Sequence, residues 1–106
     1  MKQKIVQQHF NDADGNPAGG TTAGTGIAIH WQDGPLGRGA ERKEPNGAFV
    51  EGVIQAAIGR IEYYQKSKFS SRENAIALTH LETALLWLGK RTADREEREV
   101  EGTHSV

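Results

Sequence analysis

Residues 70–90 read SSRENAIALTHLETALLWLGK, and this stretch decides the fold of the chain. Ser70 is followed three residues later by Glu73, which is the pattern of a capping box at the start of a helix. Leucines then recur with heptad spacing on one helical face, at Leu78, Leu81, Leu85 and Leu88. Leu86 and Trp87 lie off that face, so the predicted helix has a second apolar surface and needs a second packing partner.

A first helix is predicted to precede this one and to pack against it. Asn46 follows Pro45 as a candidate N-cap, and apolar residues then recur with helical period up to Tyr64. The connection over residues 67–69 is short, so the two helices should be antiparallel. Gly52 and Gly59 each cost the helix about 1 kcal/mol relative to alanine, which predicts that another backbone approaches there.

The segment before Pro45 contains most of the 13 glycines, which predicts turns and short strands. Residues 2–10 and Ile27–Trp31 are the strand candidates, the second because its apolar residues alternate. Residues 11–26 are predicted to form a flexible, turn-rich loop. The expected fold class is therefore α+β and oligomeric: a small N-terminal β-ribbon in residues 1–45, a long antiparallel α-helical hairpin in residues 46–100 and a tail in residues 101–106.

Composition excludes several classes of protein. The chain has 106 residues, a net charge of −1 and no cysteine, which argues against DNA binding and excludes disulfides and thiolate chemistry. No run approaches the roughly 18 apolar residues of a membrane span, and the polar start of the chain lacks a signal-peptide core. A soluble intracellular protein is expected.

The motifs that would support catalysis or metal binding are incomplete. Residues 20–26, GTTAGTG, lack the Gly-Lys-Ser/Thr ending of a P-loop, and Asp12 begins a turn without the spacing of a calcium loop. The spacing of the four histidines does not match that of a zinc site; they are His9, His30, His80 and His104. We therefore expect no enzyme, no metal and no cofactor.

Four residues are candidates for binding a ligand. Arg91 and Arg95 stand one helical turn apart and could clamp a phosphate group, or they could belong to a solvated charge run that continues to Glu101. Tyr64 ends the first helix beside Tyr63, so one ring of the pair should pack and the other could stack on a base. Asn74, in the first turn of the second helix, could cap locally or bond to an adenine or ribose edge.

Four strings resemble the phage Thoeris anti-defence sponge family, first type, which shares its helical hairpin with the anti-CBASS cyclic-nucleotide sponges. They are WQDGPLGRG (31–39), EPNGAFVE (44–51), RENA (72–75) and EGTH (101–104). The resemblance implies a non-catalytic phage protein in the host bacterial cytoplasm. Such a protein traps cyclic ADP-ribose isomers made by TIR-domain enzymes, and some members also hold cyclic di- or trinucleotides.

By similarity, the ligand-binding residues are Tyr64, Asn74, Arg91 and Arg95, and a second, cyclic-oligonucleotide site involves Arg38 and Arg72. Asn74 and Arg91 are 17 residues apart, which is about 26 Å along a helix and too far to close on one small ligand. The site should therefore be shared between subunits of a homo-oligomer. Two alternatives are a sponge for cyclic di- or trinucleotides that inhibits CBASS immunity, and a structural helical protein that binds a protein partner through its charged tail.

Overall fold

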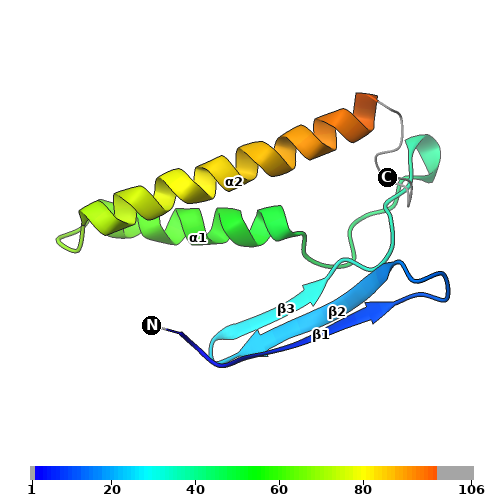
Figure 1. Cartoon of the computed structure of the whole chain (residues 1–106), viewed down its shortest axis with the longest axis horizontal. Helices are drawn as coiled ribbons and strands as arrows, with labels where there is room; N and C mark the ends of the chain where they lie inside the picture. Colours follow the sequence, from blue (N-terminus) through cyan, green and yellow to red (C-terminus); the bar gives the residue numbers. More distant parts are fainter. Residues whose placement is uncertain (1, 98–106) are drawn as a thin grey trace. The chain divides into compact units, whose positions relative to one another are not determined.

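The computed structural model describes residues 2–97, and the predicted tail over residues 101–106 lies outside this range. The chain folds as two compact units, of which the first reaches Phe49 and the second begins at Val50. A three-stranded sheet comes first and two α-helices follow, so the predicted α+β class is confirmed (Figure 1). Within the described residues, no helix is long and apolar enough to cross a membrane.

The sheet is antiparallel, with the strand order β1 (Ile5–Asn11), β2 (Pro17–Gly24) and β3 (Ile27–Trp31). The prediction of a loop over residues 11–26 was wrong, because half of that segment is the central strand β2. A glycine is needed there: Gly20 has a φ of 143°, and a β-carbon on it would overlap the carbonyl oxygen of Gln8. The strand lacks alternating large apolar residues, which is why periodicity did not reveal it.

Side chains on one face of the sheet connect all three strands. The indole Nε1 of Trp31 on β3 donates to Thr22 Oγ1 at 2.8 Å, and that hydroxyl donates to Gln7 Oε1 on β1 at 3.2 Å. Thr22 is buried, and a buried hydroxyl needs hydrogen-bond partners. This one is satisfied both as an acceptor and as a donor.

The loop between β3 and the first helix is closed by two amide side chains. Gln32 Oε1 accepts from the backbone N–H of Asn46 at 2.9 Å. Asn46 Oδ1 accepts from the N–H of Asp33 at 2.8 Å, and its Nδ2 donates to the Asp33 carbonyl at 3.1 Å. The prediction that Asn46 caps a helix was therefore wrong. Its side chain closes the loop, which contains a short 3-10 helix, η1 (Gly39–Glu41), and α1 (Val50–Gln65) begins four residues later.

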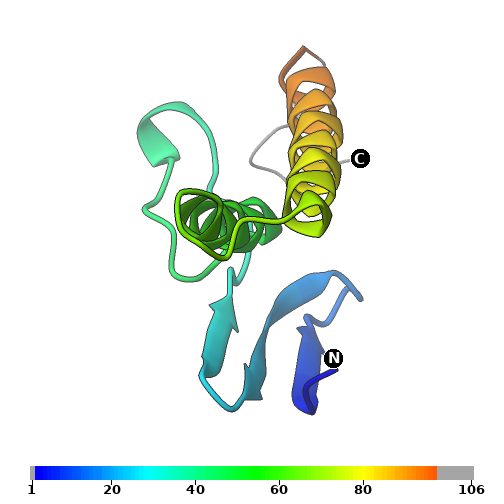
Figure 2. The ribbon, with the colours of Figure 1, turned by 90° about the vertical axis from the view of Figure 1, so that its left-hand side faces the viewer.

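The second unit is an antiparallel helical hairpin of α1 and α2 (Arg72–Glu97), which lie side by side (Figures 1 and 2). The four heptad leucines of α2 are half-buried. The predicted cap was misplaced by one residue: Ser71 Oγ, and not Ser70, accepts from the N–H of Asn74 at 3.0 Å. Ser71 suits this role because its side chain can satisfy an N–H that has no partner within the helix.

Gln65, the last residue of α1, fixes the start of α2. Its Oε1 accepts from the Ser71 N–H at 2.9 Å, and its Nε2 donates to the Ser71 carbonyl at 3.0 Å. Both hydrogen-bonding groups of one amide therefore hold the backbone of the cap residue, so the two helix ends meet in a defined geometry.

Among the described residues, no hydrophobic side chain is fully buried. Leu86 and Trp87 are 74% and 67% exposed, as expected for the second apolar face of α2. Apart from the adjoining residues and backbone of α1 itself, no described atom lies within 4 Å of a β-carbon added at Gly52 or Gly59. The backbone approach predicted at these glycines is therefore not made by the described part of this chain.

Candidate functional site

The hairpin turn brings Tyr64 and Asn74 to the same end of the two helices. The Tyr64 carbonyl accepts from Ser67 Oγ at 2.6 Å, and this Oγ accepts from the Phe69 N–H at 3.1 Å. The amide Nδ2 of Asn74 donates to the Phe69 carbonyl at 3.5 Å. A short series of hydrogen bonds thus connects the two predicted ligand-binding residues through the turn.

Tyr64 is held by Arg60, one turn earlier on α1. Arg60 Nε donates to Tyr64 Oη at 3.1 Å, and the guanidinium carbon lies over the Tyr64 ring, 4.8 Å from its centroid. The same group lies 5.0 Å from the centroid of the Tyr63 ring. Arg60 therefore covers one face of Tyr64, and a stacked base would use the other face. Arg60 was not among the predicted site residues, although its four-residue spacing from Tyr64 is a recognisable signal.

Tyr63 and Tyr64 are adjacent on α1, so they lie on different sides of the helix and differ in exposure. Tyr64 is half-buried, whereas Tyr63 is 61% exposed. Their ring centroids are 6.0 Å apart and the rings are tilted by 57°. This is the tilted arrangement that the aromatic quadrupole favours. Tyr63 is thus the matched, more exposed aromatic against which a role for Tyr64 can be tested.

Asn74 has the local role predicted for it and retains capacity for another. Its backbone N–H is satisfied by Ser71 and its Nδ2 by Phe69. Among the described residues, its Oδ1 accepts no hydrogen bond. An amide oxygen can accept from an exocyclic amino group such as that of adenine.

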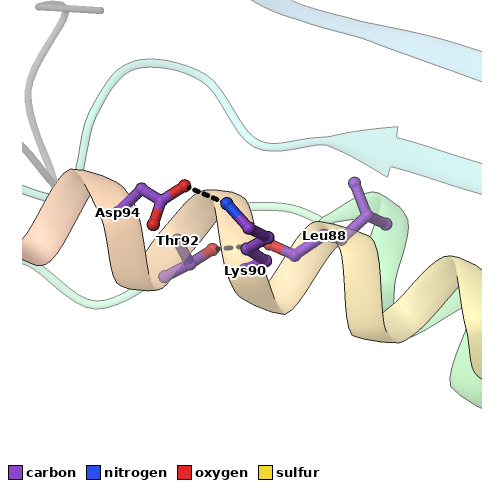
Figure 3. Close-up of polar contacts among 4 residues, drawn as sticks. All are labelled: Leu88, Lys90, Thr92 and Asp94. Carbon is purple, nitrogen blue, oxygen red and sulfur yellow. Dashed lines mark hydrogen bonds and ion pairs between the residues drawn. The ribbon is translucent and has the colours of Figure 1, made fainter.

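Arg91 and Arg95 lie near the other end of α2, beside a salt bridge that leaves Arg91 out. Lys90 Nζ bonds to Asp94 Oδ2 at 2.9 Å, and Thr92 Oγ1 donates to the Leu88 carbonyl at 3.2 Å (Figure 3). Within residues 2–97, Arg91 forms no ion pair and is exposed, whereas Arg95 is half-buried. Asp94, the described acid one helical turn after Arg91, is therefore engaged by Lys90. An exposed guanidinium such as that of Arg91 is a group that can bond to an anion.

The four predicted residues divide into two pairs at opposite ends of the hairpin. Tyr64 and Asn74 flank the turn, and Arg91 lies 17 residues beyond Asn74 on the continuous helix α2, about 26 Å away. One chain therefore does not bring the four side chains together. The exposed Leu86 and Trp87 lie on α2 between the two pairs, and Trp87 is one turn before Arg91.

The two residues predicted for a second site lie in different units. Arg38 precedes η1 in the loop that the Gln32 and Asn46 amides close, and Arg72 is the first residue of α2. Both are exposed. Among residues 2–97, no group of three or more His, Cys, Asp or Glu side chains could hold a metal ion.

Comparison with known proteins identifies a matching family and a similar phage protein. Residues 26–93 match the family described as the Acb2/Tad1 hairpin domain, a range that covers β3 and α1 and most of α2. The protein "Thoeris anti-defense 1" of Bacillus phage SBSphiJ7 is 48% identical over 82 residues, which is 77% of this chain and 55% of the relative. The chain thus spans about half the length of that relative.

Proposed function

The chain belongs to the Acb2/Tad1 hairpin-domain family, and from this premise we propose that it is a phage anti-defence protein that sequesters cyclic ADP-ribose isomers. These are the signals that TIR-domain enzymes make in Thoeris immunity. The protein acts by binding the signal without cleaving it, so that the free concentration stays too low for the downstream effector. Its place of action is the cytoplasm of the infected bacterium.

The observation that carries this proposal is the division of the candidate residues between the two ends of the hairpin. A cyclic ADP-ribose presents an adenine at one place and a diphosphate at another. Tyr64 and Asn74 offer an aromatic ring and an amide oxygen to the base, while Arg91 and Arg95 offer guanidinium groups to the diphosphate.

Closing the site then requires two chains. In an antiparallel pair of α2 helices, the turn of one chain lies beside the arginines of the other. The exposed Leu86 and Trp87 supply the apolar surface for that contact, and the two-fold pair contains two identical composite sites. The open surface at Gly52 and Gly59 is available to a further chain in the same assembly.

The four side chains support binding better than catalysis. Arginine cannot act as a base at neutral pH, and a tyrosine and an asparagine at a helical turn are not activated nucleophiles.

The second function to consider is a sponge for cyclic di- or trinucleotides that inhibits CBASS immunity. The exposed Arg38 and Arg72 favour it, because each could bond to a phosphate.

A release experiment tests the proposal. The protein is incubated with a stoichiometric amount of a cyclic ADP-ribose isomer and filtered, and the retained material is denatured and analysed by mass spectrometry. Retention followed by release of intact ligand is expected. Fragments would identify an enzyme, and a signal left wholly in the filtrate would contradict sequestration. A parallel series with cyclic trinucleotides, using Arg72→Ala as the altered variant, tests the second function.

A further inference from the structure

Strand β1 is an edge of the sheet that carries no charge and is exposed along its whole length. Its sequence is IVQQHFN over Ile5–Asn11, and every residue in it is exposed. Among the described residues, β2 is the only strand that pairs with β1, so the outer side of β1 keeps its backbone groups unpaired (Figure 1). Natural edges of this kind are blocked by charges, prolines or covering segments, or they are paired with another strand.

The charges that flank β1 are arranged so that a second copy of the same strand fits. Lys4 directly precedes the strand, and Asp12 directly follows it, before the chain turns at residues 13–15. Asp12 Oδ1 also accepts from the backbone N–H groups of Asp14 and Asn16, at 2.9 and 3.0 Å. When two copies run antiparallel with Gln8 opposite Gln8, the numbers of facing residues add up to 16. Lys4 then faces Asp12 of the other copy, and this contact occurs twice by symmetry.

The same register pairs the two large apolar side chains of one sheet face. Val6 and Phe10 are 60% and 52% exposed and alternate with Gln8 on that face. Since 6 and 10 also add up to 16, Val6 of each copy faces Phe10 of the other. A β-branched residue opposite an aromatic residue is one of the stabilising cross-strand pairs.

We propose that β1 is a self-pairing edge, through which two copies of this chain join their sheets into one six-stranded antiparallel sheet with its two-fold axis at Gln8. The edge lies outside the matched hairpin region, residues 26–93. This interface is separate from the α2 contact and does not depend on the ligand. The irregularity between His9 and Asn11 leaves the outer edge continuous, because the extra residue belongs to β2.

Cysteine cross-linking tests both the contact and its register, because the chain contains no cysteine. Facing Cα atoms in an antiparallel pair are about 4.5–5.5 Å apart, within disulfide range. Val6→Cys and Phe10→Cys proteins, each alone, should stay unlinked on mild oxidation, because identical positions are about 13 Å apart along the strand. Mixed together, they should give a disulfide-linked dimer.

Two further variants complete the test. Gln8→Cys should link to itself, whereas His30→Cys should not. His30 is equally exposed on the same face, but in the six-stranded sheet it lies about 24 Å from its counterpart. Absence of the mixed dimer, or self-linking of Val6→Cys, would overturn the proposal. Because this readout uses no ligand, it is independent of whether the protein sequesters a signal.

The flanking charges give a second measurement. Lys4→Glu places a like charge opposite Asp12, and should lower the yield of the mixed Val6→Cys and Phe10→Cys dimer by about fivefold. Lys66→Glu, the same charge change at the end of the hairpin, should leave the yield unchanged. An equal loss in both variants would show that net charge, and not this register, controls the contact.

Discussion

At the scale of single residues, Arg91 offers the sharpest test of the composite site. Arg91→Ala should weaken binding of a cyclic ADP-ribose isomer by roughly tenfold to a hundredfold, because charge-assisted hydrogen bonds to the diphosphate are worth about 1.5–3 kcal/mol. The double variant Lys90→Ala with Asp94→Ala removes the neighbouring exposed pair as a whole, so no freed carboxylate can pair with Arg91, and it should bind nearly as well as the parent. Calorimetry at matched protein concentration measures both. Equal affinities for the two variants would show that Arg91 is part of a solvated charge run and does not bind the ligand.

Tyr64 separates stacking from packing, also at this scale. Tyr64→Phe keeps the ring and loses only the hydrogen bond from Arg60, so it should bind nearly normally. Tyr64→Ala should lose about 1–3 kcal/mol of binding free energy, whereas Tyr63→Ala, at the more exposed ring, should change binding little. Thermal melts recorded beside the titrations identify the other outcome. A Tyr64→Ala protein that melts far lower would show that this ring stabilises the hairpin.

At the scale of the elements, the start of α2 depends on one of two adjacent serines. Ser71→Ala removes the hydroxyl that accepts from the Asn74 N–H and should lower the free energy of unfolding by about 1 kcal/mol. Ser70→Ala should be close to neutral. Denaturant titrations of the two variants, at one protein concentration, compare them directly. A larger loss of unfolding free energy from Ser70→Ala than from Ser71→Ala would show that Ser70 is the cap, as the capping-box pattern indicated.

The elements also show how far sequence reasoning reaches. Leucine spacing predicted α2 and its exposed second face, because helical period is a local property of the chain. Strand β2 was missed, since its requirement for Gly20 arises from the nearness of Gln8 on another strand. Asn46 was misassigned for a similar reason: its partners Gln32 and Asp33 are 13 or more residues away. The resemblance selected Tyr64 and Asn74, and the turn connects them, but no local pattern predicts the hydrogen bonds that do so.

At the scale of the whole molecule, the exposed apolar surface predicts an obligate oligomer. Light scattering at micromolar concentration should give at least the mass of a dimer, and Trp87→Glu should lower that mass because it places a charge on the α2 face. Phe69→Ser is the matched control, since Phe69 is equally exposed but lies in the turn. A stable monomer of the parent chain would contradict both the assembly and the composite site. A reduced mass for Phe69→Ser alone would place the contact at the turn.

Under the proposed function, the separation of Asn74 from Arg91 along α2 would also set the capacity of the protein. If each end of the helix supplies half of a site, a pair of chains closes two sites, and one chain accounts for one captured molecule. Inhibition is then stoichiometric. Copies of the protein must outnumber molecules of signal, and each copy stays occupied until its ligand dissociates. Immunity would be restored abruptly once signal synthesis exceeds protein abundance, with a threshold that moves in proportion to expression.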